Sequence, residues 1–193
     1  MRTALLITAA WTASFVASVP ANAADGSLDY RVLATSKTST MERELNEAAA
    51  AGYRFSKAMG GKSANGGQEV IVAMVKDPVS SGQTARKYRL LASTKTSTMQ
   101  REIQQASDQG YAYREQTVFE SAFGGREVVV IMELDPSKKA PSSSYRLLAT
   151  NKTSTMQKEL QDAGLQGYEL LGLSIGKTEV GGDEVIAILR REE

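Results

Sequence analysis

Apolar residues recur along the chain in three successive stretches that share one pattern of hydrophobic and polar positions. The first stretch opens with a short β-favouring run at 30–35, bounded by turn residues, which predicts a strand. Apolar or small residues follow at 41, 45, 48, 49 and 52, the spacing of a helix with one buried face. A run that is clearest at 168–175 in the third stretch, and a nearly continuous apolar run at 70–75, predict two more strands. Each stretch therefore predicts strand, helix, strand, strand.

The three stretches are copies of one unit. The residues Lys-Thr-Ser-Thr-Met occur at 37–41, 95–99 and 152–156. A Tyr-Arg pair precedes each methionine by eleven residues, and Gly-Tyr, Gly-Gly and Glu-Val pairs follow it at matching distances. Such spacing indicates tandem repeats without internal insertions.

The segments between the units are rich in Pro, Ser and Gly, as is typical of linkers. The predicted division is a signal peptide at 1–23, repeats at 28–77, 87–135 and 145–193, and linkers at 78–86 and 136–144.

Both ends of each predicted helix carry a recognisable signal. A serine followed three residues later by Glu or Gln predicts a capping box, in the pairs Ser39 and Glu42, Ser97 and Gln100, and Ser154 and Gln157. A glycine at the end of each apolar stripe predicts a left-handed residue that stops the helix, at Gly52, Gly110 and Gly167.

The strand order follows from the turns. The Gly-Gly turn between the second and third strands predicts an antiparallel hairpin. If the third strand lies in the middle, the first two are parallel and the helix makes a right-handed crossover between them. One unit alone buries little apolar surface. We therefore expect an α+β fold of three tandem βαββ repeats, with one helix per repeat packed on the sheet, in a pseudo-three-fold arrangement. Separate beads joined by the linkers are the alternative.

The third repeat resembles a known family at 145–148, 160–171 and 185–191. These segments are similar to small bacterial βαββ modules with the pattern Y-K-V … L-N-x-x-G-x-x-G-W-E-L-V … L-K-R, a domain of unknown function. Tyr168 stands where that family has tryptophan, and the first two repeats lack the Glu-Leu-Leu that follows the Gly-Tyr pair. The resemblance implies the fold and carries no catalytic residues.

The N-terminus has the features of a secretory signal. Arg2 precedes an apolar run at 4–19, Pro20 breaks the run, and small residues at 21 and 23 form a signal-peptidase site. An uncleaved membrane anchor is the alternative, but this run is shorter than the ~20 residues that span a bilayer. We expect an exported protein, periplasmic or extracellular, without membrane insertion after cleavage.

Composition narrows the chemistry. Cleavage after residue 23 removes only Arg2 among the charged residues, which leaves 22 Lys and Arg against 22 Asp and Glu. A neutral chain argues against nucleic acid or an anionic membrane as partner. The absence of His and Cys excludes Ser-His-Asp and Cys-His catalysis and nearly all zinc, copper and haem sites. We expect no catalytic residues, no metal and no cofactor.

The repeated turn is the strongest candidate site. A helix start offers unpaired amides and the positive end of the helix dipole, and hydroxyls and a lysine add donors for a small anion. The alternative is that Ser and Thr only cap the helix while the lysine is solvated. The candidate residues are Lys37, Thr38, Ser39, Thr40, Lys95, Thr96, Ser97, Thr98, Lys152, Thr153, Ser154 and Thr155.

Recurring charges and tyrosines form two weaker candidates. Paired carboxylates can hydrolyse glycosides, but a structural salt-bridge network is favoured for Arg31, Glu44 and Glu69 and their equivalents. Those equivalents are Arg89, Glu102, Glu127, Arg146, Glu159 and Glu184. Core or interface anchors are expected of Tyr30, Tyr53, Tyr88, Tyr111, Tyr145 and Tyr168.

The sequence therefore predicts an exported, non-enzymatic binding or interaction module. It does not identify the partner, for which a cell-envelope protein and a small anion are the two candidates. The first alternative is a binder of small anions that uses the helix-start turns. A carboxylate-based hydrolase is disfavoured.

Overall fold

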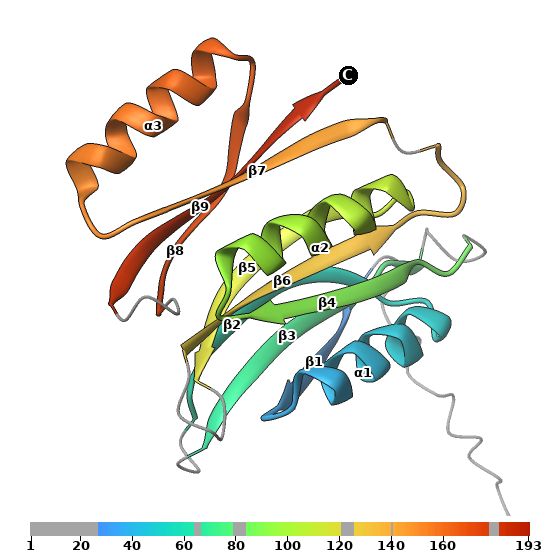
Figure 1. Cartoon of the computed structure of the whole chain (residues 1–193). Coiled ribbons are helices and arrows are strands. Elements are labelled where there is room, and N and C mark those ends of the chain that lie inside the picture. The colour runs from blue at the N-terminus through green and yellow to red at the C-terminus, as the bar shows by residue number, and fades with distance from the viewer. Residues whose placement is uncertain (1–26, 64–66, 79–83, 121–125, 140, 178–181) are drawn as a thin grey trace, which may run out of the picture.

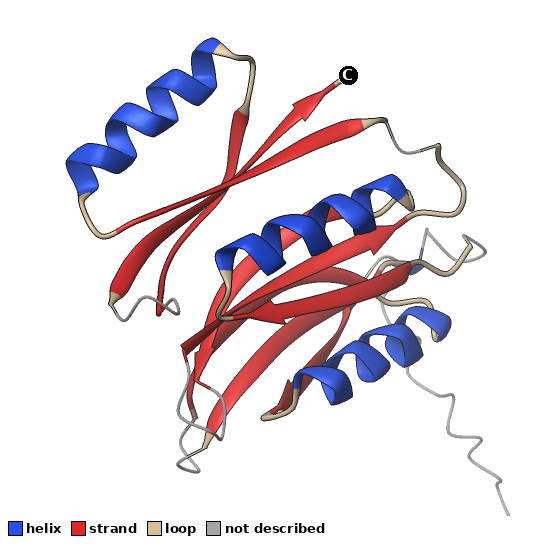
Figure 2. Cartoon of the chain, in the orientation of Figure 1, coloured by secondary structure: helices blue, strands red, loops and turns tan. Residues whose placement is uncertain are grey.

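The protein, as a computed structural model, is described at residues 27–63, 67–78, 84–120, 126–139, 141–177 and 182–193. The predicted signal peptide lies outside these residues. Three units of strand, helix, strand, strand follow one another, as predicted (Figures 1 and 2). The first comprises β1 (Asp29–Thr35), α1 (Thr38–Ala50), β2 (Arg54–Lys62) and β3 (Gln68–Lys76). The second comprises β4 (Lys87–Ser93), α2 (Thr96–Asp108), β5 (Ala112–Glu120) and β6 (Arg126–Leu134). The third comprises β7 (Ser143–Thr150), α3 (Thr153–Leu165), β8 (Glu169–Lys177) and β9 (Asp183–Glu192).

Each repeat forms its own three-stranded sheet with its last strand in the centre. β3 pairs antiparallel with β1 and β2, and β6 and β9 do the same in their sheets. The first two strands of each sheet are therefore parallel edge strands, and the helix connects them. This confirms the predicted α+β fold of three βαββ repeats.

The helix C-termini match their sequence signals. Gly52, Gly110 and Gly167 have φ angles of 90°, 88° and 81°, in the left-handed region that favours glycine. The amide after the first of these glycines, on Tyr53, donates to the carbonyl of Ala48 at 3.0 Å. This bond closes the helix end as a Schellman motif does.

The predicted capping boxes are wrong. Each helix begins at the first threonine of its turn, so the lysine before it stands at the extended N-cap position without a side-chain cap. Ser39, Ser97 and Ser154 are thus already helical, whereas a capping hydroxyl belongs to the residue before the helix. The residues three positions on in the first two helices, Glu42 and Gln100, bind the next repeat instead.

The hydrophobic core is shared between neighbouring repeats. One cluster joins Met41 and Leu45 of α1 with Val129 and Ile131 of β6. A second joins Met99 of α2 with residues of β7 and β9. The alternate side chains of β6 enter different clusters, so the middle sheet is buried on both faces, as its continuous apolar run predicts. The repeats therefore pack as one body rather than as beads.

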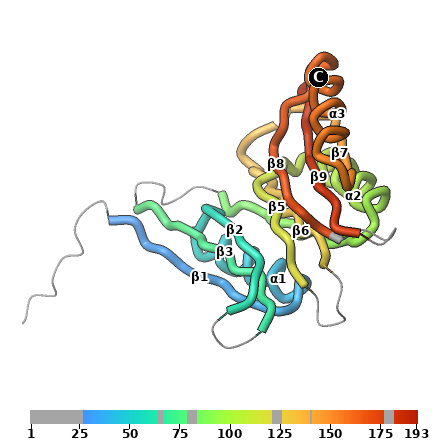
Figure 3. Tube along the Cα trace, turned by 90° about the vertical axis from the view of Figure 1, so that its left-hand side faces the viewer, coloured from blue at the N-terminus to red at the C-terminus, as the bar shows by residue number. Residues whose placement is uncertain are grey.

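The repeats are arranged as an open stack, which differs from the expected pseudo-three-fold arrangement. α1 packs on its own sheet and on β4, α2 packs on its own sheet and on β7, and β5 lies between β2 and β8. Every substantial contact between repeats in the described residues joins the first to the second or the second to the third. The first and third repeats occupy opposite ends of the molecule (Figures 1 and 3).

Candidate functional site

The lysine-threonine-serine-threonine turns lie at the starts of three helices in successive layers of the stack (Figure 1). Lys37, Lys95 and Lys152 are exposed, and each donates its amide to the hydroxyl of the strand residue two positions earlier, at 3.2, 3.0 and 3.3 Å. These hydroxyls belong to Thr35, Ser93 and Thr150, which sequence reasoning did not single out. They close the turn before the helix begins, so the structure gives the turns a local role without joining them into one site.

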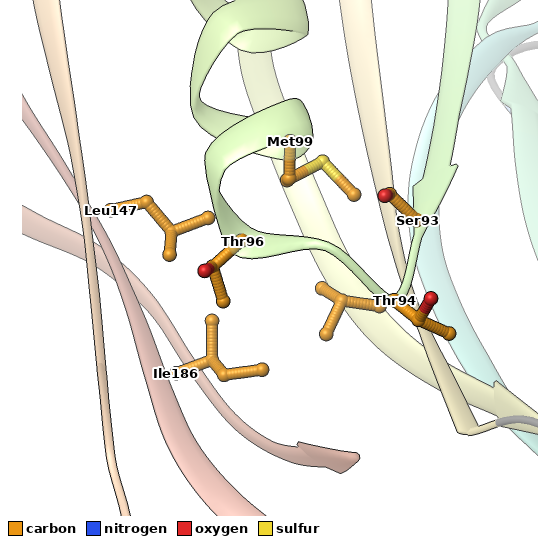
Figure 4. A pocket seen from close by; sticks show the side chains of 7 residues that line it. Ser93, Thr94, Thr96, Met99, Leu147 and Ile186 are labelled. Atoms are coloured by element: carbon orange, nitrogen blue, oxygen red, sulfur yellow. The ribbon is translucent and has the colours of Figure 1, made fainter. Parts of the chain in front are cut away.

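Thr96 has a second role, because it packs against the third repeat. Figure 4 shows its side chain facing Leu147 and Ile186 beside Met99, around a small apolar pocket. The equivalent Thr153 at the end of the stack is exposed. Packing between repeats therefore accounts for this threonine in the middle repeat, without a ligand.

The polar sides of α1 and α2 each bind the edge strand of the next repeat. The side-chain amide of Asn46 in α1 donates to the carbonyl of Tyr88 in β4 and accepts from its amide, both at 2.9 Å. Gln104 of α2 accepts the amide of Tyr145 in β7 at 3.0 Å and donates to the carbonyl of Ser143 at 3.1 Å. An edge strand has unpaired backbone groups, and here a helix side chain satisfies them.

The predicted capping-box partners extend this contact by one turn of helix. Glu42 Oε2 accepts the amide of Leu90 at 2.9 Å. Gln100 Oε1 accepts the amide of Leu147 at 2.6 Å, and its Nε2 donates to the carbonyl of Tyr145 at 2.8 Å. Two polar side chains four residues apart on the helix therefore bind successive backbone groups along the edge strand. The spacing of these polar residues was visible in the sequence, but the edge strand that they bind lies about 45 residues further along the chain.

The tyrosines near the starts of β4 and β7 each accept a hydrogen bond from the preceding repeat. Tyr88 Oη accepts the amide of Phe55 in β2 at 2.8 Å, and Tyr145 Oη accepts the amide of Tyr113 in β5 at 3.1 Å. Burial, reinforced by the carboxylate of Glu133, raises the pKa of the Tyr88 hydroxyl above its ordinary value. Both tyrosines are interface anchors, as predicted, and the bonds keep their buried hydroxyls satisfied.

The second strands of neighbouring repeats approach each other closely. Ala58 in β2 donates its amide to Glu115 Oε2 at 3.0 Å, and Gly60 donates to Thr117 Oγ1 at 2.6 Å. A Cβ on Gly60 would lie 2.1 Å from the carbonyl oxygen of Val118. Only glycine fits this approach, so the strand pair depends on it.

The predicted salt-bridge network of recurring charges is not formed by the recurring arginines. Arg31, Arg89 and Arg146 instead lie over the rings of Tyr53, Tyr111 and Tyr168, at 4.5, 4.9 and 4.3 Å from the ring centre. A guanidinium over a tyrosine face is a cation–π contact. It fastens the first strand of each repeat to the start of the second.

A separate ionic cluster ties the first linker to the middle sheet. Arg86 lies 2.6 Å from Glu133 and 3.1 Å from Asp135, and Arg114 also pairs with Glu133. Glu133 is buried, so its charge requires these partners. Since the charges pair with one another, the cluster has a structural role. No group of side chains that could hold a metal ion, and no helix long and apolar enough to cross a membrane, occurs among the described residues.

The two ends of the stack each leave one half of this contact between repeats uncovered. Tyr30, the equivalent of Tyr88 and Tyr145, is 61% exposed, against 3% and 6% for those two. At the other end Gln157 and Gln161, the equivalents of Gln100 and Gln104, are exposed on α3.

No family model, no curated protein and no solved structure matches the chain. The resemblance of the third repeat to the bacterial βαββ family therefore stays a prediction.

Proposed function

We propose that this protein is an exported, non-enzymatic interaction module that binds other protein chains through the two ends of its stack. One observation carries the proposal. The exposed large hydrophobic side chains of the described residues all belong to the first and third repeats, and none to the second. They are Leu28, Tyr30, Val32, Met59, Leu165, Leu170, Leu173 and Ile175.

The first of these surfaces is the open face of the first sheet, here called the first face. It consists of Tyr30, Val32 and Ala34 of β1, Lys57 and Met59 of β2, and Ile71, Ala73 and Val75 of β3, which lie opposite one another in the strand register. The matching face of the second sheet is buried against the first repeat. β1 is also an uncovered edge strand, which is a template for contact with another chain.

The second surface, here called the last face, belongs to the third repeat. It consists of Gln157 and Gln161 of α3 and Leu170, Leu173 and Ile175 of β8, all of them exposed. Contiguous exposed apolar side chains rimmed by polar residues are typical of surfaces that bind another protein.

The test compares one variant of each face with a control from the middle repeat. Val32→Glu and Leu173→Glu place a charge at positions that are exposed in the chain, so both variants should fold. Gln105→Glu adds the same charge on the exposed side of α2. We expect proteins isolated from the cell envelope to bind the wild type and Gln105→Glu, and to be lost with one or both face variants. Binding of the same proteins by all four chains, or of none by the wild type, would contradict the proposal.

Small-anion binding at the helix-start turns is the second candidate, because the first-turn amides of all three helices lack a side-chain cap. If it is correct, sulfate should raise the midpoint of thermal unfolding above that in chloride at the same ionic strength. The combined variant Lys37→Ala, Lys95→Ala and Lys152→Ala should lose this rise. Equal midpoints in the two salts would leave the turns with their structural role alone.

A further inference from the structure

Each end of the stack carries one half of a contact that the chain already makes twice within itself. We propose that a second copy of this chain completes it, with the last face of one copy docked on the first face of the next. This inference rests on the proposed function and names its partner. The occupant follows from the internal contact, which serves as the template.

The template has the same parts at both internal junctions. A helix side chain binds both backbone groups of the edge strand at the first junction, through Asn46 and Tyr88. Gln104 does the same with the strand that carries Tyr145 at the second. The tyrosine hydroxyl then accepts an amide of the preceding second strand in both cases. Two junctions with matching bonds show that one repeat is complementary to the next in a fixed geometry.

The last face supplies the helix half of a third junction. Gln157 and Gln161 occupy the helix positions that bind the next edge strand, but make no hydrogen bond within the described residues. Leu170, Leu173 and Ile175 stand in β8 where Phe55, Ala58 and Gly60 stand in β2. Those three β2 residues contact the second repeat through their amides. Apolar side chains of β8 therefore occupy positions that are covered at the first junction.

The first face supplies the edge-strand half of this junction. β1 pairs with β3 in the same register as β4 with β6, so the backbone groups of Tyr30 and Val32 point outward as those of Tyr88 and Leu90 do. The side chain of Val32 is 66% exposed. A Cβ on Gly61 would meet no atom within 4 Å, whereas its equivalent Gly176 lies close to Val128 of the second repeat. The space that a preceding repeat would fill is open.

The geometry excludes closure within one chain. The first and last faces lie at opposite ends of the stack (Figure 3), and the contacts between repeats join neighbours only. A contact between unlike faces is heterologous, so each added copy presents a fresh face and the assembly grows head to tail. In such an assembly Tyr30 of one copy accepts the amide of Leu170 in the other, as Tyr88 accepts that of Phe55.

The experiment uses purified chains and measures molar mass by light scattering over a wide range of concentration. The wild type and the Gln105→Glu control should form species that grow with concentration. Val32→Glu alone and Leu173→Glu alone should remain monomeric, since each lacks one half of the contact. Their mixture should form a complex of two chains and grow no further, because it joins the intact last face of the first variant to the intact first face of the second.

Three results would overturn the inference: a wild type that is monomeric throughout, a face variant that assembles by itself, or a mixture that remains monomeric. A monomeric wild type that still binds envelope proteins through its faces would remove the inference and leave the proposed function. A wild type that binds neither itself nor another protein would remove both. Gln161→Ala supplies a second readout, because it should weaken assembly while the unfolding midpoint of the monomer is unchanged.

Discussion

Replacing Gly60 by alanine should lower the free energy of unfolding by about 3 kcal/mol, as overpacking at a rigid contact does. The added Cβ would lie 2.1 Å from the carbonyl oxygen of Val118, which is backbone and cannot rotate away. β2 and β5 would have to separate, and the bond from the Gly60 amide to Thr117 Oγ1 would be lost. Urea unfolding of the purified variant and the wild type measures the difference.

Gly61→Ala is the matched control for this prediction. Gly61 follows Gly60 in the same strand, but a Cβ there would meet no atom within 4 Å. Its backbone does not require glycine, since Gly61 is not among the described glycines with a positive φ. We expect a change of less than about 0.5 kcal/mol, the range of ordinary surface substitutions. Equal losses in the two variants would mean that strand propensity, rather than the approach of the two repeats, sets the cost.

Replacing Gln104 by alanine should cost about 2 kcal/mol, because it removes two hydrogen bonds from a buried junction. The amide of Tyr145 would lose its partner, and the carbonyl of Ser143 would keep only the bond from the Ser107 hydroxyl. Both Tyr145 and Ser143 are buried. The free-energy cost of leaving a buried backbone amide unsatisfied exceeds the small gain in helix propensity from alanine. Chemical unfolding again gives the value.

The same substitution at Gln161 tests whether the effect belongs to the junction. Gln161 is the equivalent residue on α3, where no repeat follows, and its side chain is exposed. Gln161→Ala should leave the stability of the monomer within about 0.5 kcal/mol of the wild type. A loss as large as that of Gln104→Ala would place the cost inside the helix and not between repeats.

Local signals predicted the elements of the fold well. The apolar stripe that starts at Met41 predicted the helix, and the predicted hairpins are present with the third strand in the centre. Most residues of the predicted Gly-Gly turns lie outside the described residues. Gly52 and its equivalents were correctly placed at the helix ends because a left-handed residue is a local requirement. These features depend on neighbours within one repeat, so the sequence of one repeat is enough.

Features that depend on another repeat were missed. Glu42 fits a capping box locally, but its carboxylate binds the amide of Leu90 in the next repeat. The prediction of a pseudo-three-fold arrangement was wrong for the same reason, since the spacing of the repeats in the sequence does not determine how one repeat is oriented on the next. One signal was available: β8 has Leu173 and Ile175 where β2 has Ala58 and Gly60, a change toward large apolar residues at the end of the chain.

Amide hydrogen exchange distinguishes a covered edge strand from an open one, because helix side chains cover the edge strands of the second and third repeats and leave β1 open. The first informative pair is the amides of Tyr88 and Leu90, which donate to Asn46 and Glu42 instead of to water. The second pair is the equivalent amides of Tyr30 and Val32 in β1. In dilute solution we expect slow exchange for the first pair and fast exchange for the second. Equal protection of the two pairs in the monomer would contradict this expectation.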